Sequence, residues 1–175
     1  MTPEQDYKFI PLTKGYSAIV DAADYEWLSQ WKWHTRIRHG KTAYAGRLQR
    51  IEKLPNHRKS HLILMARQIC GLERGDKRVV DHINHNTLDN RRSNLRICLQ
   101  GQNARNRRKD KDNTSGYKGV SRNKQNGKWI VRIRFNYRQI TVGTFISLED
   151  AAKAYKDAAN SLFGEFAYKE PSSTN

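Results

Sequence analysis

The chain has 175 residues, with 33 Lys and Arg against 17 Asp and Glu, and its formal net charge is +16. A positive charge of this size attracts polyanions, so nucleic acid is the default partner. No stretch approaches the roughly 20 apolar residues of a membrane-spanning helix, and the N-terminus has neither the basic start nor the apolar core of a signal peptide. We therefore expect a cytoplasmic protein that binds no membrane.

The two cysteines, Cys70 and Cys98, form no CxxC motif. Their number and spacing exclude a thiolate zinc site and a disulfide framework. We expect both to be reduced, buried thiols.

The first 71 residues read as a β-rich scaffold. Residues 8–20 alternate loosely between apolar and polar and are broken by Pro and Gly, which predicts short strands, and residues 21–31 begin with an Asp that can cap a helix. Residues 32–49 predict a hairpin that turns at a His-Gly pair, and residues 61–71 predict an apolar helix that ends at a Gly. The tryptophans expected in the core, rather than as platforms for base stacking, are Trp27, Trp31 and Trp33.

A dense polar motif follows in "VVDHINHNTLDNRRSNLR", residues 79–96. Asp81 and His82 end a short predicted strand, and a second strand begins at Asn94. Between them lies a loop of Asn, Asp and Arg that can hydrogen-bond to itself. The next segment, "LQGQNARNRR", predicts a helix that carries Asn103.

This strand-loop-strand-helix pattern resembles the HNH nuclease motif, in the variant with Asn as the last residue that is found in phage group I intron homing endonucleases. The resemblance covers residues 78–108 and implies one divalent metal, Mg²⁺ or Mn²⁺, held by Asp81 and Asn103. It also implies that His82 is the general base and that Asn94 pins the loop and orients His82. Carboxylate and amide oxygens suit Mg²⁺, and an ordinary imidazole, with a pKa of about 6.5, can accept a proton from water.

Three details of the motif depend on the fold. Consecutive strand residues point to opposite faces, so Asp81 and His82 share a site only if the strand ends or twists there. His85 lies three residues after His82, where the family usually has Gly, and we expect it to shape the loop rather than bind metal. Asn106 lies one helical turn from Asn103 and is the fallback ligand.

The charge gathers in the middle of the chain, where residues 91–138 hold 15 of the 33 Lys and Arg and only two acids. Within this stretch, "RNRRKDKDNTSG" lacks large apolar residues and ends in turn formers, as linkers do. A solvated linker and a segment that contacts phosphates fit it equally well. We place the domain boundary here, between residues 1–111 and 112–175.

After the linker, residues 116–122, 127–135 and 138–145 predict three strands, and residues 148–164 predict a helix opened by Ser147. Alternation in the second strand places Trp129, Val131 and Ile133 on the face toward the helix. The opposite face carries Lys and Arg that the domain itself does not need, which favours contact with phosphates or bases.

The segment from "YKGVSR" to "LFGEFA" is similar to the plant APETALA2/ethylene-response-factor DNA-binding domain, in its "YKGV" opening, its "GKW" turn and strand, its "VGTF" and its "AAKAY" helix. In that family the sheet lies in the major groove of double-stranded DNA. Two departures are Thr141, where the family has Trp, and Arg132, where it has Glu. The positions that the resemblance assigns to the DNA face are Lys118, Arg122, Arg132, Arg134, Gln139 and Thr141.

The sequence therefore predicts an α+β protein, with a β-rich scaffold and an HNH unit followed by a three-stranded antiparallel sheet packed on one helix. We expect a metal-dependent, site-specific DNA endonuclease that acts as a monomer without a protein partner. A non-catalytic DNA-binding regulator with a degenerate HNH unit is the alternative. An RNA-binding protein would explain the charge but would leave the Asp-His pair without a purpose.

Overall fold

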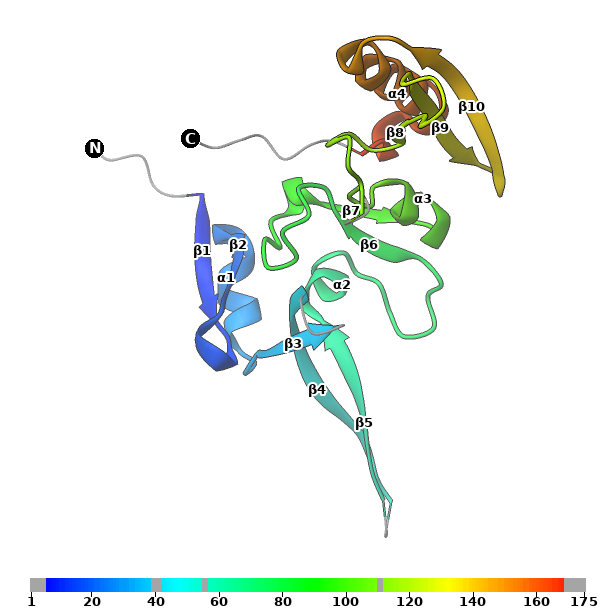
Figure 1. Cartoon of the computed structure of the whole chain (residues 1–175). Helices are drawn as coiled ribbons and strands as arrows, with labels where there is room; N and C mark the ends of the chain where they lie inside the picture. The colour runs from blue at the N-terminus through cyan, green and yellow to red at the C-terminus, as the bar shows by residue number, and fades with distance from the viewer. Residues whose placement is uncertain (1–5, 39–41, 55–56, 110–111, 169–175) are drawn as a thin grey trace, which may run out of the picture. The chain divides into compact units, whose positions relative to one another are not determined.

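The structure, a computed structural model, describes residues 6–38, 42–54, 57–109 and 112–168 (Figure 1). It divides into two compact units: the described residues up to Gln100 form the first, and those from Gly101 form the second. Several small antiparallel sheets and short helices make up the first unit, so the predicted α+β class is confirmed. No described helix is long and apolar enough to cross a membrane.

The first unit begins with a hairpin, in which β1 (Tyr7–Pro11) pairs with β2 (Ser17–Asp21), and helix α1 (Ala22–Ser29) follows directly. Asp21 occupies the N-cap position of α1, as predicted, but its side chain makes no capping bond and instead accepts a hydrogen bond from the backbone N–H of Arg92. Trp33 is buried, as expected, while Trp27 and Trp31 pack partly buried against the same core.

The second sheet has the order β3-β4-β5, formed by β3 (His34–Arg38), β4 (Thr42–Leu54) and β5 (His57–Leu64). The turn predicted at residues 39–40 lies outside the described residues. The helix predicted over residues 61–71 is wrong in its first part, because residues 61–64 pair with β4 and only α2 (Met65–Ile69) is helical. Apolar residues in a short run fit a strand or a helix equally well, and the partner strand decides here.

The last part of the first unit is a ribbon in which β6 (Val79–His82) pairs with β7 (Leu95–Cys98), and a 3-10 turn, η2 (Arg92–Asn94), leads into β7. Leu95 joins the buried core beside Val20 and Met65, so the ribbon rests on the scaffold. Cys98 is buried and Cys70 is half-buried, and burial raises the pKa of the Cys70 thiol.

Helix α3 (Gln100–Arg105) spans the division between the units and is shorter than the helix predicted over residues 99–108. The sheet of the second unit has the order β10-β9-β8, formed by β8 (Val120–Arg122), β9 (Trp129–Phe135) and β10 (Arg138–Phe145), so the predicted three-stranded antiparallel sheet is confirmed. Helix α4 (Leu148–Phe163) covers one face, and Ser147 caps it by accepting hydrogen bonds from the backbone N–H groups of Glu149 and Asp150. The functional boundary predicted between residues 111 and 112 stays a prediction, because the division after Gln100 describes packing.

The helix and sheet of the second unit approach closely at Gly119, which has a φ of +72°. A Cβ atom there would lie 2.1 Å from Cε2 of Tyr155 and 2.6 Å from the carbonyl oxygen of Arg132. Only glycine fits this space and this backbone conformation. The core beneath it contains Val131, Ile133 and Ala151, so the predicted inner face of β9 is confirmed.

Candidate active site and nucleic-acid interface

Asp81 lies in the β6–β7 ribbon, directly opposite Arg96 in the antiparallel register. Its Oδ2 accepts hydrogen bonds from Nη2 of Arg96 at 2.6 Å and from Nε at 2.9 Å. The side chains of both residues are largely buried. A buried carboxylate is costly without such a partner. Arg96 therefore holds the Asp81 carboxylate at a fixed position on the ribbon.

His82 follows Asp81 at the end of β6 and is also buried. Strand β6 ends at His82, and the negative charge of Asp81 acts on the His82 ring, so the two side chains lie near one another at the strand end. The ring packs against Tyr44 with 6.4 Å between ring centroids. Burial lowers the pKa of His82, and this effect outweighs the hydrogen bond with Asn90 and the negative charges of Asp81 and Asp89, which favour the imidazolium. His82 is therefore a neutral imidazole near pH 7, the form that accepts a proton.

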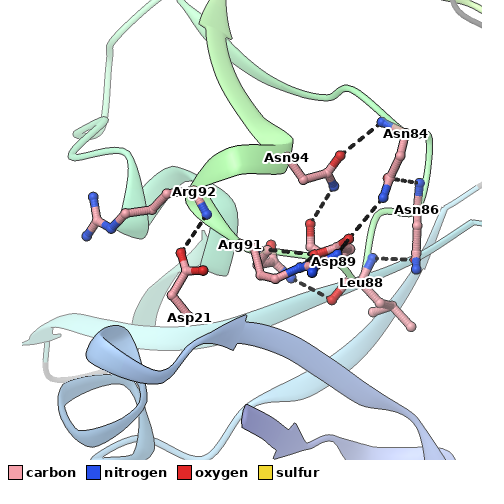
Figure 2. A network of polar contacts seen from close by, with 9 residues as sticks. Asp21, Asn84, Asn86, Leu88, Asp89, Arg91, Arg92 and Asn94 are labelled. Atoms are coloured by element: carbon pink, nitrogen blue, oxygen red, sulfur yellow. Dashed lines mark hydrogen bonds and ion pairs between the residues drawn. The ribbon is translucent and has the colours of Figure 1, made fainter. Parts of the chain in front are cut away.

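Asn94 connects the two ends of the loop between the strands (Figure 2). Its Oδ1 accepts a hydrogen bond from the backbone N–H of Asn84 at 2.9 Å, and its Nδ2 donates to the carbonyl oxygen of Asp89 at 2.7 Å. The backbone N–H of Ile83 donates to the Asn94 carbonyl at 2.9 Å. Asn94 and its bond to Asp89 are buried, whereas its bond to Asn84 is partly buried, and together the bonds hold the residues that follow His82 in place.

Asp89 is the charged centre of the same loop (Figure 2). Arg91 donates to both of its carboxylate oxygens, and Nδ2 of Asn84 donates to Oδ2 at 2.9 Å. Burial raises the pKa of Asp89, but the bonds from Arg91 and Asn84 outweigh burial and hold the pKa below its ordinary value. The backbone of Asn90 also donates to Ile19, which fastens the loop to β2.

The remaining predicted residues of the motif are found at two places. His85 has a φ of +64°, the left-handed conformation that glycine adopts readily, which fits the expectation that it shapes the loop. Asn103 is half-buried on α3, and Asn106, just after the helix, is buried; both belong to the second unit. The pairing of Asp81 with Asn103 therefore stays a prediction.

A carboxylate such as that of Asp81 and an amide oxygen such as that of Asn103 are each a ligand type that a hard divalent cation prefers. Among the described residues no three His, Cys, Asp or Glu side chains form a metal-binding group. Substrate phosphate and water would thus supply the other ligands of a metal at Asp81, as Mg²⁺ sites commonly require.

A second candidate surface is the face of the β8–β10 sheet that α4 does not cover. In the register, Arg134 pairs with Gln139 and Arg132 pairs with Thr141, so the four side chains share one face. All four are exposed. The structure therefore brings these four predicted residues together.

Two predicted DNA-face residues lie elsewhere. The Nζ of Lys118 donates to the carbonyl oxygens of Arg105 and Arg107, at 2.8 Å and 2.5 Å, and so fixes the end of α3 within this unit. Arg122 has the strand parity of buried Val120, and its guanidinium lies 5.8 Å from the Trp129 ring centroid. The face holding Arg132 and Arg134 does not include them.

Sequence reasoning missed three residues of the first site, Asp89, Asn90 and Arg96. The signal for Arg96 was present, because antiparallel pairing of the two predicted strands sets it opposite Asp81. The local sequence carries no comparable signal for Asn90, whose role depends on the backbone of Ile19 and on the His82 ring.

No protein-family model matches the chain. Over 154 residues, or 88% of this chain and 74% of the relative, it is 31% identical to a protein of Acanthamoeba polyphaga mimivirus named as an uncharacterized HNH endonuclease, L560. It is also 34% identical to Protein 3.8 of Escherichia phage T7, over 50% of this chain and 72% of that protein. A third similarity, 30% over 44% of this chain, is to 29% of the ethylene-responsive transcription factor ERN1 of Medicago truncatula.

Proposed function

The chain belongs to the HNH endonuclease family, and from this premise we propose that it is a metal-dependent, site-specific endonuclease of the homing type that hydrolyses double-stranded DNA. The observation that carries the proposal is the buried, neutral His82 beside a buried Asp81 that Arg96 holds in place, at the end of one strand. Neither side chain packs as part of an apolar core, and burying both is costly without a function.

In the proposed reaction His82 takes a proton from the attacking water, whose oxygen bonds to a backbone phosphorus while the bond from phosphorus to one sugar oxygen breaks. The departing sugar oxygen takes a proton from solvent. Asp81 and Asn103 would hold one Mg²⁺ or Mn²⁺, which supplies Lewis-acid stabilisation of the phosphate charge and of the departing oxygen. Asn94 is a positioning residue, because its two bonds fix the backbone that follows His82. Arg96 holds the Asp81 carboxylate in place through two hydrogen bonds to its Oδ2.

The exposed face of the β8–β10 sheet would bind duplex DNA and place the chain at its cleavage site. Arg132 and Arg134 present two guanidinium groups beside Gln139 and Thr141, and guanidinium and amide groups are the ones that read base edges in the major groove. The similarity to part of a named transcription factor supports this role.

The test is incubation of the full chain with genomic DNA in Mg²⁺ or in EDTA, with the new ends mapped on each strand. We expect discrete, metal-dependent ends with wild-type protein and none with His82→Gln. Because Gln keeps a polar side chain of similar size, binding measured in EDTA should change less than about threefold, well under the 1.4 kcal/mol that a tenfold change represents.

Metal-independent ends would contradict the proposed chemistry. Binding without cleavage in both Mg²⁺ and Mn²⁺ would instead favour the alternative, a DNA-binding regulator with a degenerate HNH unit. Equal loss of cleavage and binding in His82→Gln would remove the general-base assignment.

A further inference from the structure

The β4–β5 pair continues well beyond the sheet that supports it. Strand β3 pairs with β4 only at Thr42–Gly46, whereas β4 and β5 stay paired from Gly46 to Leu54 (Figure 1). A two-stranded ribbon is marginally stable in water on its own, so packing alone does not account for this length. Such a ribbon has dimensions that fit a groove of duplex DNA.

One face of this ribbon is polar and cationic. Gln49 pairs with His61, and Arg47 lies two residues before Gln49, so all three side chains share a face. This face lines a hollow of about 640 Å³, whose polar lining residues include one acid, Glu73. The polar residues with cationic or amide groups that line it are Arg47, Gln49, His61, Arg67, Gln68 and Arg74.

Two of the three arginines that line the hollow, Arg47 and Arg67, are already held in place by contacts within the chain. The guanidinium of Arg47 lies 4.3 Å from the Trp31 ring centroid, and its Nε donates to Oε1 of Gln68 at 3.1 Å. Arg67 donates to three backbone carbonyl oxygens of residues 73–78, which fixes the loop beside the hollow. Binding an anion here would require little further ordering of these two side chains.

We propose that this hollow binds the phosphate backbone of duplex DNA and is a contact separate from the β8–β10 sheet. The residues that line the hollow carry three guanidinium groups and one carboxylate, and a guanidinium group matches the geometry of phosphate oxygens. Neither the cleavage chemistry nor the second unit requires these residues. The inference rests on the proposed function, because that function makes duplex DNA the substrate.

The experiment measures the affinity of the full chain for a fluorescent duplex in EDTA, over a series of salt concentrations. Each phosphate contact adds about one to the slope of log affinity against log salt. Arg74→Gln should lower the slope by about one, and Gln49→Lys, which adds a cation on the same face, should raise it by about one. Lys8→Gln removes an exposed charge from β1, outside the hollow, and is the matched control.

The proposal is overturned if the salt slopes of Arg74→Gln and Gln49→Lys both equal the wild-type slope. It is also overturned if Lys8→Gln lowers the slope as much as Arg74→Gln does. In either case, wild-type binding with metal-dependent cleavage would leave the proposed function standing. A wild-type chain that neither binds nor cuts duplex DNA would overturn both. Opposite changes in the two hollow variants cannot come from misfolding, which weakens binding in each.

Discussion

His82 makes folding stability depend on pH. Burial, opposed by Asn90 and by two carboxylates, lowers its pKa below the ordinary 6.5. As the pH falls below 6.5 the unfolded chain binds a proton at His82 before the folded chain does, so the free energy of unfolding decreases. This contribution is complete above pH 6.5 and is lost progressively until the pH reaches the folded pKa.

The measurement is urea denaturation between pH 7.5 and pH 5 in EDTA, which removes any bound metal. We expect wild-type protein to lose more stability over this range than His82→Gln, which cannot titrate at this position. Parallel curves for the two proteins would show that His82 titrates alike in the folded and unfolded states, and would remove the argument for a buried neutral base.

A substitution at Asn94 tests how the loop between β6 and β7 keeps the residues around His82 in place. Replacement by Ala removes an acceptor for the backbone N–H of Asn84 and a donor to the carbonyl of Asp89. A buried backbone group left unpaired costs about 1–3 kcal/mol, so we expect Asn94→Ala to lower the free energy of unfolding by about that amount or more. Cleavage should decrease as well, because the residues after His82 lose their anchor.

Asn86→Ala is the matched control, since Asn86 belongs to the same network but is exposed. Its partner, the backbone N–H of Leu88, can bond to water instead, so the loss should stay under about 1 kcal/mol. Denaturation of the two variants side by side measures the difference. Equal losses would mean that burial of Asn94 does not strengthen its bonds.

Among the elements, the approach of α4 to the sheet gives the sharpest prediction. Gly119→Ala should lower the free energy of unfolding of the second unit by more than about 2 kcal/mol, since overpacking costs about 1–3 kcal/mol and a positive φ adds about 1–2 kcal/mol. Gly116 has a φ of +81° with no atom within 4 Å of an added Cβ, so Gly116→Ala carries only the conformational cost. Thermal denaturation of both variants isolates the contact with Tyr155.

The elements that could be predicted are those whose pattern is local. The sequence of the β8–β10 sheet and α4 shows strand alternation, a Ser that can cap the helix and a Gly that can end it. The structure has all three features. The helix predicted from residue 61 fails because β4, not the local sequence, decides that residues 61–64 are extended. The missing cap bond of Asp21 has a similar cause, since Arg92 lies far along the chain.

The candidate site divides in the same way. Asp81, His82 and Asn94 follow from the order of residues in the motif, and the loop that bonds to itself follows from its Asn and Asp content. The ion pair with Arg96 depends on strand register, and the displaced position of Lys118 depends on the carbonyl groups at the end of α3. Sequence spacing alone does not distinguish a side chain that donates to a distant backbone carbonyl from one that is free to contact DNA.

At the scale of the whole molecule, the proposed cleavage site and the proposed DNA-binding face of the sheet belong to different surfaces, and variants should separate the two activities. Arg134→Gln removes one exposed guanidinium from the uncovered face of the sheet, so we expect weaker binding in EDTA and a salt slope lower by about one. At saturating protein concentration the variant should still cut DNA in Mg²⁺, but the new ends should be spread over more positions. The substitution weakens recognition of the DNA site and leaves the cleavage reaction unchanged.

Lys153→Gln is the matched control, since Lys153 is an exposed cation on α4, the element that covers the opposite face of the same sheet. Its slope and its pattern of ends should equal those of wild type. The double variant His82→Gln/Arg134→Gln should bind as Arg134→Gln does and leave DNA uncut. A loss of cleavage by Arg134→Gln that persists at saturation would mean that the sheet takes part in the chemical step, and the division of roles between the two surfaces would be wrong.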